Sequence, residues 1–213
     1  MTKTEGAFTY KRLSNGILSS NTYILWDEDK VCAIIDPGND ASSIDKEVVK
    51  YGLTVKYIIL THAHYDHIFF LDELKQKFEE SVVICHENEN ESFSNPYKNG
   101  SLLFGSAKVF NKADKTVKDQ DTLLLGKEEI EIIHTPGHTE GGICIRAGKF
   151  LFTGDTLFYR SYGRTDLGDG SDEKMAESLK KLSNMDPSII VLPGHGTFST
   201  IGDEKKYNPF MGV

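Results

Sequence analysis

A short stretch, Thr61 to His67 (THAHYDH), constrains the fold more than any other feature of the chain. It places three histidines and one carboxylate within six positions, directly after the apolar run 57–60. A lone histidine is usually a polar residue with satisfied hydrogen bonds. Four such groups so close together at the end of a buried strand predict one half of a two-metal site.

The spacing within this stretch suggests how its side chains point. His62 and His64 are two residues apart, so an extended chain directs both the same way. Asp66 and His67 follow as the chain turns into a helix, so we expect them to face a second, nearby centre. The positive end of a helix favours neutral imidazole, which is the form that binds metal.

Three further candidates lie far downstream, namely His138, Asp155 and His195. Each follows a predicted strand and sits in a loop that contains glycine, which lets backbone approach an ion closely. Loops at strand ends converge on one edge of an α/β sheet, and this is where such folds build sites. We therefore expect these residues to join the Thr61–His67 stretch.

Hydrophobic periodicity predicts an α/β chain, because strands and helices alternate. The elements expected in the first half are strands at 23–26, 31–35, 55–60 and 81–85, with helices at about 41–50 and 68–78. The elements expected in the second half are strands at 129–133, 142–145, 150–153 and 188–192, with a helix at about 171–184. Segment 95–106 is either a surface excursion or a loop that borders the substrate.

Composition limits the class of protein. The 213 residues suffice for one core, so a single domain over 1–213 is expected. A net charge of −8 disfavours nucleic acid as a partner. No run approaches the ~18 apolar residues of a membrane span, and no export signal is evident. The three cysteines lie in apolar runs, which predicts reduced thiols in the cytoplasm.

These motifs resemble the metallo-β-lactamase superfamily. The pattern His-x-His-x-Asp-His is followed in family order by His138, Asp155 and His195, and the resemblance extends through 36–38 (DPG) and 154–158 (GDTLF). Within the superfamily the chain is most similar to the glyoxalase II-like, or hydroxyacylglutathione hydrolase-like, proteins. It looks closest to short bacterial members that lack the C-terminal glutathione-binding helical domain.

The resemblance implies a four-layer αβ/βα sandwich with two divalent metal ions at one edge. It assigns one metal to His62, His64 and His138, and the other to Asp66, His67 and His195, with Asp155 bridging both. Nitrogen and oxygen donors suit Zn²⁺, with Fe or Mn as alternatives. Asp66 is also expected to orient the nucleophile, which makes it the candidate catalytic residue.

The resemblance further implies a binuclear hydrolase of small thioesters, such as S-lactoylglutathione or the ester of another low-molecular-weight thiol. A metal-bridging hydroxide would attack the carbonyl. The thiol leaving group has a pKa near ~8.5 and departs without a dedicated general acid. Arg164 is either a ligand for a substrate carboxylate or a surface ion pair, and Asp36 is either a hydrogen-bond partner of a ligand histidine or a turn residue.

Two departures leave glutathione specificity open. Only residues 196–213 follow His195, which is too short for the helical domain, and Phe69 and Phe70 replace the usual glycines. The alternatives are a lactonase or phosphodiesterase on the same site, a mononuclear iron persulfide dioxygenase, and a metal-binding module without activity. The oligomeric state stays open.

Overall fold

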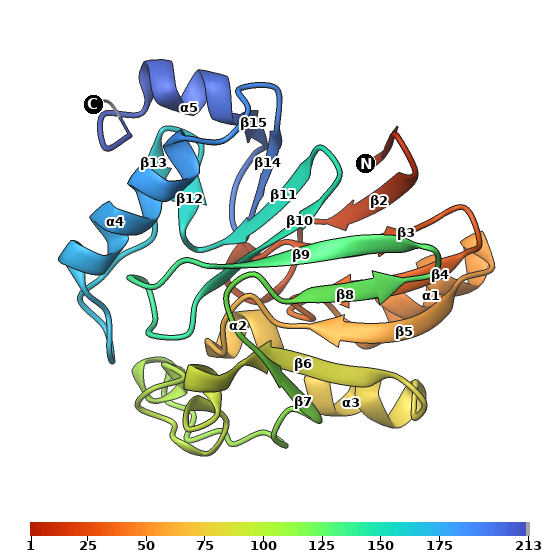
Figure 1. Cartoon of the computed structure of the whole chain (residues 1–213). Coiled ribbons are helices and arrows are strands. Elements are labelled where there is room, and N and C mark those ends of the chain that lie inside the picture. Colours follow the sequence, from red (N-terminus) through yellow and green to blue (C-terminus); the bar gives the residue numbers. More distant parts are fainter. Residues whose placement is uncertain (212–213) are drawn as a thin grey trace.

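The computed structural model describes residues 1–211, so the last two residues of the predicted domain lie outside it. Two β-sheets pack face to face, and helices cover their outer faces (Figure 1). This is the four-layer α/β sandwich that the sequence predicts. Within the described residues, no helix has the length and hydropathy that a membrane span requires.

The first sheet is built from the N-terminal half of the chain. Its strands, in spatial order, are β1 (Thr2–Glu5), β2 (Phe8–Leu13), β3 (Thr22–Trp26), β4 (Val31–Ile35), β5 (Thr54–Ile59), β6 (Val82–His86) and β7 (Lys115–Val117). The neighbours from β4 to β7 are parallel. Helix α1 (Ala41–Tyr51) begins where Asp40 accepts a hydrogen bond from Ser43 N at 2.9 Å, and it ends at Gly52, whose φ is 64°.

The second sheet is built from the C-terminal half. Its strands, in spatial order, are β15 (Ser199–Thr200), β14 (Ile190–Pro193), β11 (Phe150–Gly154), β10 (Ile143–Ala147), β9 (Glu128–His134) and β8 (Thr122–Leu125). A small ribbon, β12 (Leu157–Phe158) and β13 (Ser161–Tyr162), follows β11. Helix α4 (Asp172–Ser183) is capped by Ser171, whose side chain accepts from Lys174 N, and α5 (Ile201–Tyr207) follows β15.

Aromatic side chains fill the space between the sheets. Tyr10 packs edge-on against Phe150, with ring centroids 4.9 Å apart, and Tyr23 packs against Phe152 at 5.1 Å. All four are buried. Separate apolar clusters join each sheet to its outer helices, with Ile44 of α1 on one side and residues of α4 on the other. Burial on both faces explains why the strands are nearly continuous apolar runs.

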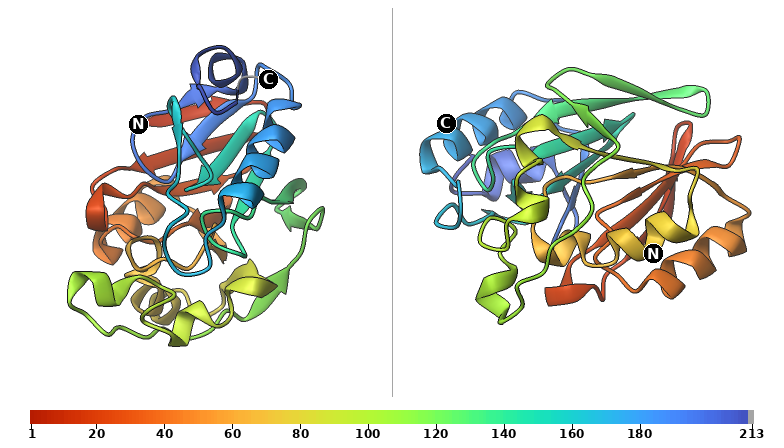
Figure 2. Two further views of the ribbon diagram at one scale, coloured as in Figure 1. Left: turned by 90° about the vertical axis from the view of Figure 1, so that its left-hand side faces the viewer. Right: turned by 90° about the horizontal axis from the view of Figure 1, so that it is seen from below.

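The strands that carry the candidate residues all end at one edge of the sandwich, the edge that faces the reader in Figure 2, left. β4, β5 and β6 are parallel in the first sheet, and β11 and β14 are parallel in the second. Backbone hydrogen bonds join the two sheets there, from Ile143 N to Thr61 O at 2.8 Å and from Asn21 N to Gly194 O at 2.7 Å. The edge is therefore a rigid junction of both halves.

The helix predicted at 68–78 is wrong in its bounds, because the structure has two shorter helices. These are α2 (Tyr65–Ile68) and α3 (Leu71–Lys77). Phe70 N donates to Pro37 O at 3.1 Å, and Asp66 O accepts from Ser20 Oγ at 2.9 Å. These tertiary bonds replace the Phe70-to-Asp66 bond of a continuous helix, so the chain breaks between α2 and α3.

Candidate metal centre

The structure brings all seven predicted metal-site residues together at the shared sheet edge. Four come from the loop and helix after β5, and one each follows β9, β11 and β14. The seven are His62, His64, Asp66, His67, His138, Asp155 and His195. That each of the seven binds metal stays a prediction.

Three imidazoles, those of His62, His64 and His138, form what we call the first triad. One ring nitrogen of each lies within 4.8 Å of the others. His64 Nδ1 and His138 Nε2 are only 2.7 Å apart. Nε2 of His62 is buried and has no hydrogen-bond partner in the described structure. The three rings therefore point nitrogen atoms at one common space.

The second triad consists of Asp66, His67 and His195. Asp66 Oδ2 lies 3.0 Å from His195 Nε2 and 3.5 Å from His67 Nε2. The two imidazole Nε2 atoms are 3.2 Å apart. Gly194, next to His195, has no room for a Cβ, because the carboxylate of Asp155 and the ring of His67 fill that position.

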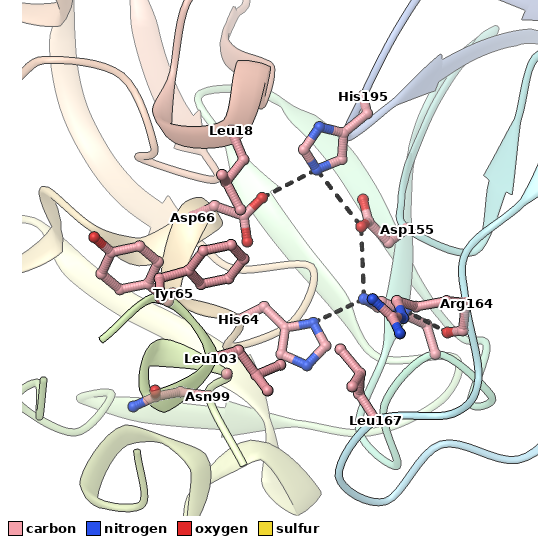
Figure 3. Close-up of a pocket in the computed structure, with 13 residues that line it drawn as sticks. Leu18, His64, Tyr65, Asp66, Asn99, Leu103, Asp155, Arg164, Leu167 and His195 are labelled. Carbon is pink, nitrogen blue, oxygen red and sulfur yellow. Dashed lines mark hydrogen bonds and ion pairs between the residues drawn. The ribbon is translucent and has the colours of Figure 1, made fainter. Parts of the chain in front are cut away.

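Asp155 lies between the triads and contacts both. Its Oδ2 is 3.5 Å from His138 Nε2 in the first triad and 3.6 Å from His195 Nε2 in the second. Its Oδ1 is 3.3 Å from His67 Nε2 but makes no hydrogen bond. Figure 3 shows this carboxylate between His195 and His64. A carboxylate in this position can bridge two centres.

The donor set fits metal ions better than hydrogen bonding alone. One N–H can serve each pair of facing imidazole nitrogens, but Nε2 of His62 and Oδ1 of Asp155 are buried and have no hydrogen-bond partner among the described residues. Two of the rings are also held through their other nitrogen. His67 Nδ1 lies 3.0 Å from Asp36 Oδ2, and His138 Nδ1 lies 2.7 Å from Arg164 O. These acceptors hold the proton on Nδ1, so Nε2 presents its lone pair to the centre.

The electrostatics of the two triads differ. Burial lowers the pKa of His62 well below its usual value and that of His64 to about 3, so both rings are neutral. Burial acts on His67 in the same direction, but the carboxylates of Asp66 and Asp155 outweigh it and raise the pKa of His67 well above its usual value. The second triad therefore attracts positive charge strongly, as a cation site must.

Asp36 is a hydrogen-bond partner of the site as well as a turn residue. Its Oδ1 accepts from Thr61 N at 2.7 Å, and its Oδ2 accepts from Thr61 Oγ1 at 2.6 Å and lies against His67 Nδ1. The carboxylate thus fixes both the start of the histidine-rich loop and the orientation of a triad ring.

Glu89 was not anticipated from the sequence. It is buried, and its carboxylate accepts hydrogen bonds from Ala63 N at 2.9 Å, from Gly141 N at 3.1 Å and from Thr139 Oγ1. It thereby ties the loop of His62 and His64 to the loop of His138. The sequence does place Glu89 just after a predicted strand. Glu87 and Glu91 follow the same strand, so this position does not single out Glu89.

A pocket of about 170 Å³ opens above the triads (Figure 3). Segment 95–106 borders this pocket through Asn99, Gly100, Leu103 and Phe104. Arg164 also lines it, but the guanidinium is paired with Asp166, with Nε and Nη2 donating at 2.7 and 2.8 Å. The backbone oxygen of Arg164, rather than its side chain, contacts the first triad. A role for Arg164 in binding substrate stays a prediction.

A sequence profile described as the metallo-beta-lactamase superfamily matches residues 15–195, which span both triads and Asp155. The chain belongs to the metallo-β-lactamase superfamily. The His and Asp clusters described above agree with the metal-binding hydrolases of this superfamily.

Individual relatives within the superfamily cover nearly the whole chain. The probable metallo-hydrolase YqgX of Bacillus subtilis is 34% identical, over 95% of this chain and 97% of its own length. The hydroxyacylglutathione hydrolase GloC of Haemophilus influenzae is 36% identical, over 90% of this chain and 92% of its own length.

Two solved structures extend the comparison. BLEG-1, described as a B3 metallo-beta-lactamase, superposes with a TM-score of 0.90 at 35% identity, over 96% of this chain and all of its own. The structure of TTHA1623 in a di-iron-bound form superposes with a TM-score of 0.82 at 28% identity. The match covers 94% of this chain and 99% of that chain. The predicted family and fold class are thus confirmed.

Proposed function

We propose that this protein is a binuclear metal-dependent hydrolase of small thioesters. The observation that carries the proposal is the place of Asp155, whose carboxylate contacts both triads. A mononuclear centre needs only one set of three protein ligands and an open position. Two triads joined by a shared carboxylate support two ions held close together.

Two divalent ions would be held by the first and second triads, with Asp155 shared between them. When bound, such a pair activates water near neutral pH and polarises a carbonyl. The donors are nitrogen and oxygen, which suit Zn²⁺, and we propose zinc. Iron is the alternative, supported by the di-iron relative.

The protein's own groups support a thioester in preference to an amide. In the described chain, the titratable groups that line the pocket are Tyr65, Arg164 and five residues of the metal centre, namely His64, Asp66, His138, Asp155 and His195. Arg164 is paired with Asp166, and the hydroxyl of Tyr65 points away from Asp66 in Figure 3. An amide nitrogen leaves only after protonation, whereas a thiol of pKa about 8.5 leaves as thiolate.

Asp66 is the group placed to orient the nucleophile. Its Oδ2 lies 3.0 Å from His195 Nε2, and its side chain lines the pocket. A water molecule in that space would lie within reach of the Asp66 carboxylate, which can orient the attacking oxygen. The relative named hydroxyacylglutathione hydrolase supports a thioester as the substrate class.

Metal analysis followed by thioester assays tests the proposal. We expect two metal ions per chain, thioester hydrolysis that a chelator abolishes, and recovery when Zn²⁺ is returned. One iron per chain with consumption of oxygen would contradict the hydrolase and favour the dioxygenase. Cleavage of lactones or phosphodiesters without cleavage of thioesters would move the proposal to those substrates.

Three broader expectations belong to the same proposal. Residues 1–213 act as one domain, supported by triads that draw on both sheets. The compartment is the cytoplasm, supported by three buried free thiols, those of Cys32, Cys85 and Cys144. The partner is a small molecule, and neither nucleic acid nor a membrane is involved.

A further inference from the structure

Apolar side chains surround the mouth of the pocket above the triads. Leu18 comes from the turn before β3, Leu103 and Phe104 from the segment between β6 and β7, and Leu167 from the loop after β13. Leu18, Leu103 and Phe104 are 50%, 60% and 53% exposed. Figure 3 shows Leu18, Leu103 and Leu167 around one space. Large apolar groups gathered at a pocket favour an apolar ligand.

Leu18 is held in a backbone conformation that non-glycine residues rarely adopt. Its φ is 52° and its ψ is 26°. Ile17 N donates to Gly38 O at 3.0 Å, and Ser20 Oγ donates to Asp66 O at 2.9 Å, so both flanks of Leu18 are fixed. Strained residues held by their surroundings cluster at ligand sites. The strain here places an apolar side chain beside Asp66.

The opposite wall of the pocket is anchored to the metal-site helix. The ring of Phe104 stacks on Tyr65, with centroids 5.9 Å apart and an interplanar angle of 15°. Tyr65 in turn packs edge-on against Phe69 at 5.1 Å. Tyr65 belongs to α2, which also carries Asp66 and His67. The apolar wall therefore has a defined position relative to the second triad.

The pocket offers little to an anionic substrate beyond the metal site itself. Within residues 1–211, Arg164 is the only lysine or arginine that lines the pocket. Its guanidinium already donates two hydrogen bonds to the Asp166 carboxylate. The chain as a whole carries a net charge of −8. The two carboxylates of a glutathione thioester would thus meet no unpaired Lys or Arg side chain in the pocket.

We propose that the pocket selects thioesters that have an apolar acyl arm and an uncharged thiol, over thioesters of an anionic thiol such as glutathione. The apolar arm lies between Leu18 and the Leu103–Phe104 wall. This inference rests on the proposed thioesterase function. It differs from what the name of the Haemophilus relative says of that protein.

Three thioesters, assayed with the metal-loaded full chain, test the inference. They are S-lactoylglutathione, lactoyl-N-acetylcysteamine and butyryl-N-acetylcysteamine. The first two share an acyl group and differ in the charge of the thiol, and the last two differ in the apolarity of the acyl group. We expect kcat/KM to be about tenfold higher for lactoyl-N-acetylcysteamine than for S-lactoylglutathione, and higher again for the butyryl ester.

A matched pair of variants locates the effect. Leu103→Ser should raise KM for the butyryl ester about tenfold with kcat unchanged. The apolar contact it removes stabilises the bound substrate and the transition state equally. Leu102→Ser is the control, since Leu102 is 51% exposed and does not line the pocket. We expect its KM to equal that of the wild type.

The outcomes separate this inference from the function on which it rests. A preference for S-lactoylglutathione, or equal KM values for the two leucine variants, would overturn the inference and leave the thioesterase intact. If the protein cleaves none of the three esters in a chelator-sensitive way, the thioesterase proposal fails and the inference fails with it.

Discussion

Replacing Asp36 with asparagine should weaken metal binding at the second triad more than at the first. The Asp36 carboxylate accepts from Thr61 N, accepts from Thr61 Oγ1 and lies 3.0 Å from His67 Nδ1. An amide has one acceptor oxygen, so asparagine keeps at most part of this set. Its NH₂ group would face the N–H of His67 or the hydroxyl of Thr61.

The magnitude follows from the role of such partners. Removing the group that orients a metal-binding histidine typically costs 10–100-fold in metal affinity. That range corresponds to about 1.4–2.8 kcal/mol. The first triad should lose less, because Arg164 O orients His138 and the hydrogen bonds of Asp36 reach His62 only through Thr61 Oγ1, whereas they reach His67 directly. We therefore expect a difference of about tenfold or more between the two sites.

Competition titration of the apoprotein against a chromophoric chelator measures both affinities. Asp27→Asn is the matched control, because Asp27 is also a buried aspartate that accepts hydrogen bonds from backbone N–H groups, those of Val31 and Lys127. It should leave both metal affinities unchanged. Equal weakening of both triads in Asp36→Asn, or no weakening at all, would refute the orienting role of Asp36.

Three further predictions address the bridge, the core and the buried glutamate. Asp155→Asn should lower metal affinity at least about tenfold at both triads, and retention of two tightly held ions would contradict the shared position. Phe152→Ala should lower the free energy of unfolding in urea by about 3–5 kcal/mol, because this ring is buried between the sheets; a loss below about 1 kcal/mol would contradict its packing. Burial raises the pKa of Glu89 to about 7, so the native state binds its proton more tightly than the unfolded chain. This contribution to stability is complete below the unfolded pKa of 4.5 and is lost as the pH rises through about 7. The unfolding free energy of the wild type minus that of Glu89→Gln should therefore fall by up to about 1.4 kcal/mol per pH unit between about pH 5 and 7, and a flat difference would contradict it.

Much of the fold follows from local signals in the sequence. The apolar runs at 31–35 and 55–60 correspond to β4 and β5, and the helix predicted at about 41–50 is α1 (Ala41–Tyr51), with Asp40 and Gly52 as its caps. These elements form where local preference and tertiary packing agree. The short elements β12, β13 and β15 are two residues long, too short for any periodicity to indicate them.

Beyond the ligand motif, fewer features of the site could be predicted from the sequence. The break between α2 and α3 depends on Phe70 N bonding to Pro37, and Glu89 acts through Ala63, Thr139 and Gly141. These contacts join residues that are tens of positions apart, so no local pattern encodes them. Motif spacing indicates which residues converge. The groups that orient them can be identified only once the two sheets are packed together.

Anomalous diffraction from crystals of the metal-loaded protein would test the two-metal centre most directly. The geometry predicts two peaks per chain, one within the His62–His64–His138 triad and one within the Asp66–His67–His195 triad, with the Asp155 carboxylate between them. A single peak, or a second peak away from these triads, would contradict the binuclear centre.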